Sequence, residues 1–247
     1  MSDDAAHTRP PASVPRIERL SQLELTPQRL AFRRVAAEMR DIIELLTATT
    51  ASAEELGEAA DALADIAAVL RSHPKGRPYE GFAELANAQG PVDLDPATLA
   101  NLAAELHATF DHSPFIGLAN PLSPPVTLKM EPTRTVGTVT FGSAYEGPPG
   151  CVHGGYVAAA FDELLGSAQS LSGMQGMTAY LHVDYRSPSP LRRELNLEAW
   201  VERAEGRKVF CRGTLRVGEV LCAEAEGLFI AMNPQKFRDL LANRSDS

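Results

Sequence analysis

The sequence predicts an α+β protein in which an antiparallel sheet wraps around one central helix, preceded by an α-helical N-terminal extension. Helical periodicity dominates up to about residue 112, and alternating strand patterns dominate after it. A single long apolar helix, roughly residues 155–171, interrupts these strands. A lone apolar helix must bury its surface against another layer, so the sheet has to curl around it.

Composition limits the function classes. The chain has 247 residues, 44% of them hydrophobic and 22% charged, which is ordinary for a globular protein. A net charge of −9 argues against a nucleic-acid surface but not against a small phosphate-bearing ligand. No apolar run approaches the ~20 residues of a membrane span, and Met1–Pro15 has no signal-like hydrophobic core, so a cytoplasmic location is expected. Cys211 and Cys222 fall in strand-like runs and are expected to be buried thiols.

The first half divides into a disordered tail (residues 1–20) and a helical extension (residues 21–112). Thr26-Pro27 predicts a helix start, and apolar residues recur at helical spacing to about Thr47. Ser52 to Glu55 forms a capping box that opens a second helix, ended by His73-Pro74. These helices are expected to form an antiparallel hairpin. Its charged residues (Arg33, Arg34, Glu54 and Glu55) are expected on a solvated face, and a third helix is expected from Asp95 to about Phe110.

The second half is expected to be one domain, residues 113–236, followed by a C-terminal tail, residues 237–247. Expected strands cover residues 127–130, 135–141, 178–185, 195–202, 209–217 and 220–232, the last four being consecutive and antiparallel. Within 178–185, strict alternation places Ala179, Leu181, Val183 and Tyr185 on one face, and Thr178, Tyr180, His182 and Asp184 on the other. A strand pair, an apolar helix and four further strands correspond to the hotdog fold.

The stretch Gly150–Asp162 carries the strongest chemical signal. Gly154 and Gly155 allow a sharp turn that opens directly into the helix, whose first N–H groups have no intrahelical partner and favour negative charge. Such a turn can hold an oxyanion. Asp162 lies among apolar helical residues, where a carboxylate suggests catalysis. The alternative is a simple turn with a solvent-facing acid. Glu163 points about 100° away and is expected to be structural or salt-bridged.

These motifs resemble a known family. Gly150-Cys-Val-His-Gly-Gly155, Asp162 nine residues after the histidine, and Met177-Thr-Ala179 are similar to the PaaI-like hotdog acyl-CoA thioesterases. Within them, the carboxyl-terminal modulator protein type is the most similar branch. The strings Tyr185-Arg-Ser-Pro-Ser-Pro190, Glu205-Gly-Arg-Lys208 and Ala223-Glu-Ala-Glu-Gly-Leu-Phe-Ile230 fit this branch too. The resemblance covers about residues 114–236 and does not reach the first hundred residues.

The resemblance implies hydrolysis of a fatty-acyl or aryl coenzyme A thioester to free acid and thiol. It assigns Asp162 as general base or nucleophile and Thr178 as the hydroxyl that places the water or the carboxylate. It assigns the backbone N–H of Gly154, with Gly155 beside it, as the donor to the thioester carbonyl, and His153 as the residue that shapes the turn. Many relatives carry Asn or Gln six or seven residues before this motif. Here Gly147 and Glu146 stand there, so either Glu146 supplies a second acid or the backbone alone holds the carbonyl.

The resemblance also implies a homodimer or homotetramer with sites at the dimer interface, Asp162 of one subunit facing Gly154 of the other. No metal or bound cofactor is implied, because coenzyme A is part of the substrate. Arg186 is a candidate for the coenzyme phosphates, in a cluster with Arg192, Arg193, Arg207 and Lys208; solvated turn charge is the alternative. Two other functions stay open: a non-catalytic acyl-CoA-binding sensor or scaffold, and a hotdog hydratase or dehydratase.

Overall fold

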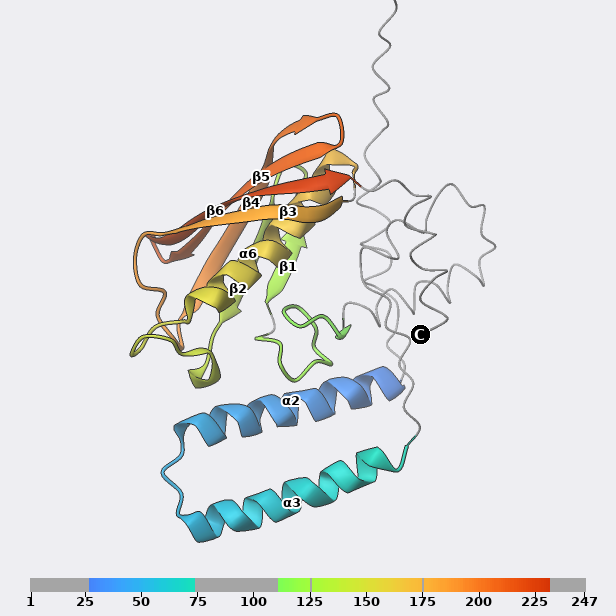
Figure 1. The fold of residues 1–247 in the computed structure, drawn as a ribbon, viewed down its shortest axis with the longest axis vertical. Coiled ribbons are helices and arrows are strands. Elements are labelled where there is room, and N and C mark those ends of the chain that lie inside the picture. The colour runs from blue at the N-terminus through green and yellow to red at the C-terminus, as the bar shows by residue number, and fades with distance from the viewer. Residues whose placement is uncertain (1–26, 74–110, 125, 175, 232–247) are drawn as a thin grey trace, which may run out of the picture.

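The computed structural model describes residues 27–73, 111–124, 126–174 and 176–231. Its central feature is one six-stranded antiparallel sheet in the order β1-β2-β4-β5-β6-β3 (Figure 1). The strands span Thr127–Met130 (β1), Thr135–Thr140 (β2), Gly176–Tyr185 (β3), Glu194–Glu205 (β4), Lys208–Val217 (β5) and Val220–Ala231 (β6). All six predicted strands are therefore confirmed. The last four strands are antiparallel as expected, but β3 pairs with β6 rather than with β4, so β3 forms an edge of the sheet.

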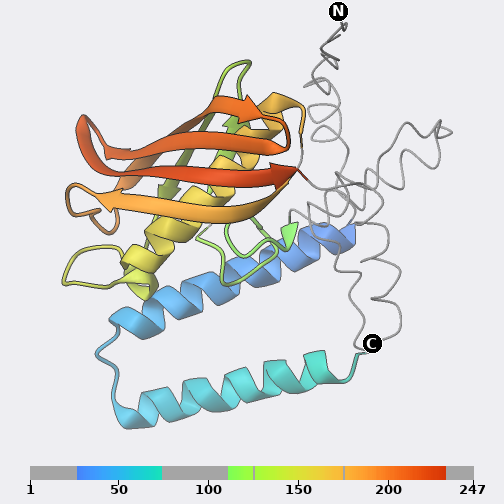
Figure 2. The same cartoon turned by 45° about the horizontal axis from the view of Figure 1, so that its top comes forward.

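Helix α6, Gly154–Gln169, lies across the concave face of this sheet (Figure 2). Its buried residues recur at helical spacing: Val157, Ala160, Phe161, Leu164, Leu165 and Ala168. Phe161, Leu164 and Leu165 are fully buried, because the twisted sheet covers one side of the helix. The α+β hotdog fold predicted from the sequence is confirmed. Cys211 and Cys222 are buried in the same core, and burial raises the pKa of Cys211 to about 12.

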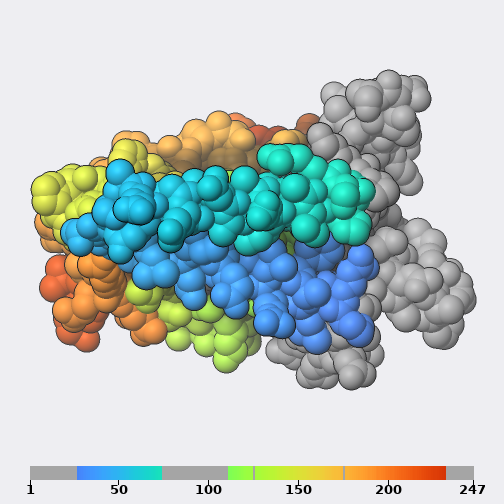
Figure 3. Space-filling view, turned by 90° about the horizontal axis from the view of Figure 1, so that it is seen from below, coloured from blue at the N-terminus to red at the C-terminus, as the bar shows by residue number. Residues whose placement is uncertain are grey.

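The N-terminal hairpin consists of α2, Pro27–Ala48, and α3, Ala53–Arg71, which run in opposite directions (Figures 1 and 2). The predicted capping box is present: Ser52 N–H donates to Glu55 Oε2 at 2.8 Å, and Glu55 N–H donates to Ser52 Oγ at 3.3 Å. Figure 3 shows both helices spread over one face of the molecule. The predicted third helix, the predicted N-terminal tail and the predicted C-terminal tail lie outside the described residues.

Arginines attach α2 to the segment that leads into the sheet. Asp111 is 4% exposed and accepts hydrogen bonds from Arg29 at 3.0 Å and from Arg33 at 2.6 Å. The expectation that Arg33 lies on a solvated face is therefore wrong, because a buried carboxylate needs a charged partner and Arg33 supplies one. Further along α2, Arg40 donates to the carbonyl oxygens of Leu118 and Asn120 at 3.1 and 2.9 Å. Half of the hairpin is thus fixed to the hotdog domain.

Candidate functional site

The glycine turn starts α6 with a histidine cap. His153 is the N-cap residue, with an extended backbone (φ −60°, ψ 131°), and its Nδ1 accepts the Gly155 N–H at 3.0 Å. The Tyr156 N–H donates to the His153 carbonyl at 2.9 Å. The amide of Gly155 is therefore already used inside the turn. The amide of Gly154 has no acceptor among the residues that the structure describes, so it is the donor left for a ligand.

Glu146 holds the other end of the turn. Its Oε1 accepts the Gly150 N–H at 2.6 Å, and Gly150 has the left-handed φ of +74° that favours glycine. The Gly147 N–H donates to the Cys151 carbonyl at 2.9 Å, which closes the loop. Glu146 is thus engaged with the backbone of the turn itself. This contact supports the second of the two options given above, in which the backbone alone holds the substrate carbonyl.

Asp162 and Thr178 come together on the helix-facing side of the sheet. Thr178 Oγ1 donates a hydrogen bond to Asp162 Oδ1 at 2.8 Å. Asp162 lies on α6, two turns beyond the capped start, and Thr178 lies on the edge strand β3. Both residues are exposed in the single chain. The sequence-based idea that Asp162 sits in apolar surroundings is therefore wrong for one chain taken alone, because β3 leaves this side of α6 uncovered.

A β-bulge makes this contact possible. The pairing of β3 with β6 shifts register between Thr178 and Tyr180, so that Thr178 lies opposite the buried Phe229 while Tyr180 lies opposite Leu228. Tyr180 donates to Glu226 on the outer face at 3.1 Å. Strict alternation placed Thr178 and Tyr180 on the same face, and that prediction is wrong. With regular pairing extended from Leu181 through the strand, Thr178 would lie opposite Ile230 and point away from α6.

Glu163, next to Asp162 on α6, is a partly buried acid. It accepts a hydrogen bond from Ser113 Oγ at 3.0 Å, which agrees with the structural role expected for it. Burial raises the pKa of the Glu163 carboxyl above its ordinary value. The hydrogen bond from Ser113 opposes this rise, and the negative charge of Asp162 adds to it. Glu163 therefore connects α6 to the segment around Asp111 and Ser113, which α2 also contacts, next to the exposed Asp162.

Arg186 lies just after β3 and is occupied by acidic neighbours. Its guanidinium is 2.6 Å from Glu224 and 3.1 Å from Asp184. The hydrogen bond to Glu224, with the negative charge of Asp184, raises the pKa of Arg186 above its ordinary value. These contacts lie on the outer face of the sheet, away from Asp162. The structure therefore does not bring Arg186 together with the other candidate residues.

Tyr185 is a residue of this region that sequence reasoning did not single out as part of the site. Its hydroxyl donates to the carbonyl oxygen of Gly154 at 2.7 Å, so β3 is hydrogen-bonded directly to the first residue of α6. A Cβ at Gly154 would lie 3.2 Å from this hydroxyl, so any other residue here requires a small shift of the tyrosine. The available signal was its predicted place on the same strand face as the apolar Leu181 and Val183.

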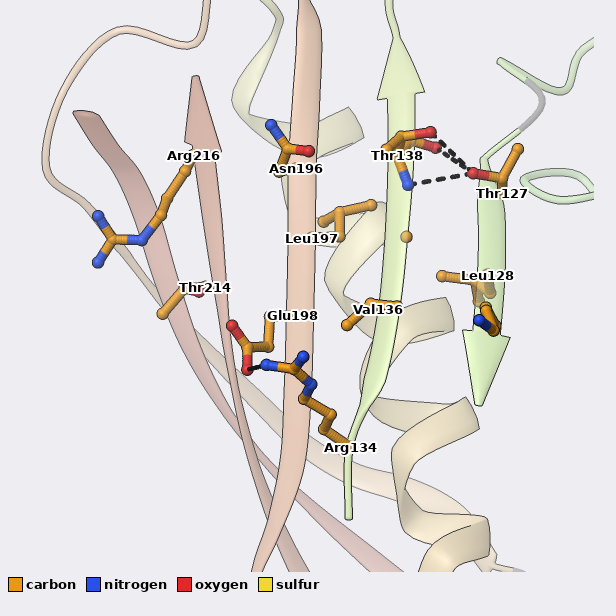
Figure 4. Close-up of a pocket in the computed structure, with 12 residues that line it drawn as sticks. Thr127, Leu128, Arg134, Val136, Thr138, Asn196, Leu197, Glu198, Thr214 and Arg216 are labelled. Carbon is orange, nitrogen blue, oxygen red and sulfur yellow. Dashed lines mark hydrogen bonds and ion pairs between the residues drawn. The ribbon is translucent and has the colours of Figure 1, made fainter. Parts of the chain in front are cut away.

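The two halves of the candidate site are far apart within one chain. Gly154 and Asp162 are eight positions apart on α6, which corresponds to about 12 Å along the helix axis. A groove of about 510 Å³ lies elsewhere, on the side of β2 and β4 turned away from α6 (Figure 4). Its lining includes Arg134, Glu198 and Arg216 but neither Asp162 nor Thr178. One chain therefore presents the carboxylate and the free amide as separate surfaces.

In the described ranges, no group of three or more His, Cys, Asp and Glu side chains is arranged to hold a metal ion. None of the helices described is both long enough and apolar enough to cross a membrane.

In sequence and fold, the chain is similar to proteins of one known family. The profile of the thioesterase superfamily matches residues 149–226. A crystal structure of a thioesterase superfamily protein is 31% identical in sequence, with a TM-score of 0.65, over 81% of this chain and 94% of that one. Acyl-coenzyme A thioesterase THEM4 of Mus musculus is 35% identical over 105 residues, which are 42% of this chain and 45% of the relative.

A second curated relative gives the same picture. Acyl-coenzyme A thioesterase THEM4 of Xenopus laevis is 40% identical over 95 residues, which are 38% of this chain and 43% of the relative. The chain thus spans less than half the length of these curated relatives, whereas it spans nearly all of the crystallised protein.

Proposed function

This chain belongs to the thioesterase superfamily, and we propose that it hydrolyses acyl-coenzyme A thioesters to the free acid and coenzyme A. The observation that carries the proposal is the hydrogen bond from Thr178 to Asp162, on the exposed side of α6 at the open edge of the sheet. The names of the curated relatives support the same substrate class.

The chemistry needs few groups, because a thioester carbonyl is electrophilic and a thiolate leaves easily. As a general base, Asp162 removes a proton from the water that attacks the carbonyl carbon, and this proton passes to the departing thiolate. As a nucleophile, Asp162 attacks that carbon itself and expels the thiolate, and water then cleaves the resulting anhydride to release the acid. Thr178 holds the carboxylate in one orientation. The Gly154 N–H donates to the carbonyl oxygen as negative charge develops there, and the helix N-terminus favours that charge. His153 keeps the turn in place through its cap to Gly155.

Two chains are needed to assemble one site. The ~12 Å between Gly154 and Asp162 is too long for both to contact one carbonyl group within a single chain. The edge strand β3 is open to pairing, and Met177 and Tyr185 on it are 57% and 55% exposed. We propose a homodimer, or a tetramer built from it, in which Asp162 of one subunit faces Gly154 of the other. A cytoplasmic location and a role of Arg186 in binding coenzyme phosphates stay predictions.

The test is thiol release from a panel of short, medium, long and aromatic acyl-CoAs, with the native chain and the Asp162→Asn variant. Hydrolysis by the native chain that falls by two orders of magnitude or more in the variant, roughly the range for losing an essential group, supports the proposal. Tight acyl-CoA binding without thiol release from any substrate would overturn it in favour of a sensor. Sedimentation of the native chain as a monomer under assay conditions would refute the shared site.

A further inference from the structure

The carboxylate of Glu44 reaches from α2 to the backbone that precedes the glycine turn. Its Oε2 accepts the N–H of Ser143 at 2.5 Å, and its Oε1 lies 3.3 Å from the guanidinium of Arg192. Ser143 opens the short 3₁₀ helix η1, Ser143–Tyr145, which leads directly into Glu146. Ser143 and Glu44 are 99 positions apart in the sequence, so this contact joins the N-terminal extension to the candidate site.

Both groups that Glu44 joins belong to segments that hold the turn. On one side, the carbonyl of Tyr145 accepts the His153 N–H at 2.8 Å, immediately before the start of α6. On the other side, the segment that ends at Arg192 includes Ser189, whose carbonyl accepts the Val152 N–H at 2.8 Å. Arg192 also donates to the hydroxyl of Ser143. A single carboxylate thus connects the two backbone segments that flank the turn.

The local backbone is arranged around this carboxylate. Gly142 lies beside it, and a Cβ at this position would overlap Glu44 Oε2. Arg192 has a φ of +55° and is the one non-glycine residue with positive φ in the part of the chain that the structure describes. This conformation costs free energy for an L-residue and persists where the surroundings enforce it. Here the Arg192 N–H donates to the Phe141 carbonyl at 2.8 Å, and its side chain meets Glu44 and Ser143.

The Ser143 amide contributes more to this contact than the ion pair does. The side chains of Arg192 and Glu44 are 63% and 37% exposed, so water screens their attraction. Burial works to raise the pKa of Glu44, but hydrogen bonds from Ser143 and Arg192 outweigh it and hold that pKa below its ordinary value. Glu44 is therefore ionised at neutral pH and accepts a charge-assisted hydrogen bond from the backbone.

We propose that Glu44 is a positioning residue for the turn that carries the Gly154 amide. Through this residue, helix α2 holds the turn in its active conformation. The inference rests on the proposed thioesterase function for its catalytic consequence. A donor to a developing oxyanion must be held within a fraction of an ångström, because small misplacements reduce the rate strongly. Loss of Glu44 frees η1, and the turn that follows it, while leaving Asp162, Thr178 and Gly154 unchanged.

Four variants test this inference. Glu44→Ala removes the acceptor, Glu44→Gln keeps an oxygen acceptor without the charge, and Gly142→Ala displaces the carboxylate without changing it. Glu38→Ala is the matched control. Glu38 is an exposed carboxylate on the same helix, without a hydrogen bond or ion pair to any described residue. Kinetic constants are measured per folded chain, well below the midpoint of thermal unfolding of each variant.

We expect kcat to fall about tenfold in Glu44→Ala and Gly142→Ala with KM little changed, since the turn acts mainly on the transition state. Glu44→Gln should retain most of the activity, and Glu38→Ala all of it. The second readout is hydrogen exchange at the amides of Gly147 and His153, both bonded within the turn. Their exchange should accelerate about tenfold or more in Glu44→Ala and Gly142→Ala alone.

The two readouts separate this inference from the proposed function. If the native chain releases no thiol, the proposed function fails, and the exchange rates still decide whether Glu44 holds the turn. Unchanged exchange at Gly147 and His153 in Glu44→Ala, or equal losses in Glu38→Ala, would overturn the positioning role. A change in melting temperature with kcat and exchange at native values would also overturn it, because Glu44 would then only stabilise the fold.

Discussion

Replacement of Gly154 by proline tests the oxyanion donor directly. Proline removes the one N–H of the first turn of α6 that has no partner among the described residues. The position suits proline, because it is the first helical residue, and His153 before it already has the extended backbone that precedes proline. No hydrogen bond among the described residues is lost. The substitution therefore deletes a catalytic donor with little change in local structure.

The expected magnitude follows from the bonding of this turn. Gly155 N–H is used by His153 Nδ1 and Tyr156 N–H by the His153 carbonyl, so the oxyanion relies on a single backbone donor. Loss of one such donor lowers kcat by about 10²–10³. Gly154→Ala is the matched control, since it adds the same Cβ near the Tyr185 hydroxyl but keeps the N–H. Its activity should stay within about threefold of the native value, the small loss reflecting that close contact.

A mixing assay then asks whether the amide and the carboxylate act from different chains. Gly154→Pro and Asp162→Asn chains, each with its own affinity tag, are co-expressed and assayed for thiol release. In a symmetric dimer with shared sites, each mixed dimer has one intact site and one site that lacks both groups. Random pairing yields about half mixed dimers, so the mixture should recover about a quarter of native activity.

Either of two results would refute this reasoning. If the mixture is no more active than each variant alone, Gly154 and Asp162 serve the same site from one chain, and the ~12 Å argument is wrong. If Gly154→Pro retains native kcat in a correctly folded protein, the amide is not the oxyanion donor. Purification through both tags isolates the mixed dimers, whose activity should then be about half of the native value, and circular dichroism checks that they are folded.

Three further substitutions probe the surroundings of the site. Thr178→Val should lower kcat about tenfold, because Asp162 loses a hydrogen bond of about 1.4 kcal/mol, whereas Thr178→Ser should retain activity in the same thiol-release assay. Tyr185→Phe should lower kcat about threefold to tenfold at nearly unchanged melting temperature, since it releases the Gly154 carbonyl at an exposed position; an unchanged kcat would exclude this role. Glu163→Gln should raise the melting temperature by about 2–4 °C at pH ~7 and by less at pH ~4. Burial raises the pKa of Glu163, so its ionised form opposes folding as pH increases through that raised pKa, and calorimetry at both pH values checks the sign.

Periodic elements were predictable from the sequence. The long apolar run over residues 155–171 predicted α6, and the Ser52–Glu55 capping box predicted α3, because both signals are local in the chain. The strands followed from alternation in the same way. The order of the strands in the sheet could not be predicted in this way. The position of β3 beside β6 depends on tertiary pairing between distant segments, which alternation within one strand does not reveal.

The site was predictable in its residue types and not in its geometry. Resemblance singled out Asp162 and Thr178, which the structure places in contact. The bulge that brings them together is a shift in pairing register, and residue alternation cannot reveal such a shift. Glu44 escaped notice for a different reason: its partner Ser143 is 99 positions away, and an acid on a helix is usually solvated.

The bulge in β3 makes the candidate site depend on the pairing register of a strand as well as on its composition. The side chains before and after Ala179 alternate out of step, so that Thr178 and Leu181 share a face although three positions separate them. Deleting Ala179 would restore a regular ladder with Thr178 still opposite Phe229, so the hydroxyl would keep its face. Regular pairing of the whole strand with Leu181 opposite Gly227 would instead place Thr178 opposite Ile230, on the outer face. A variant in which the bulge moves past Thr178, toward the start of the strand, is therefore expected to keep the fold and lose the hydrogen bond to Asp162.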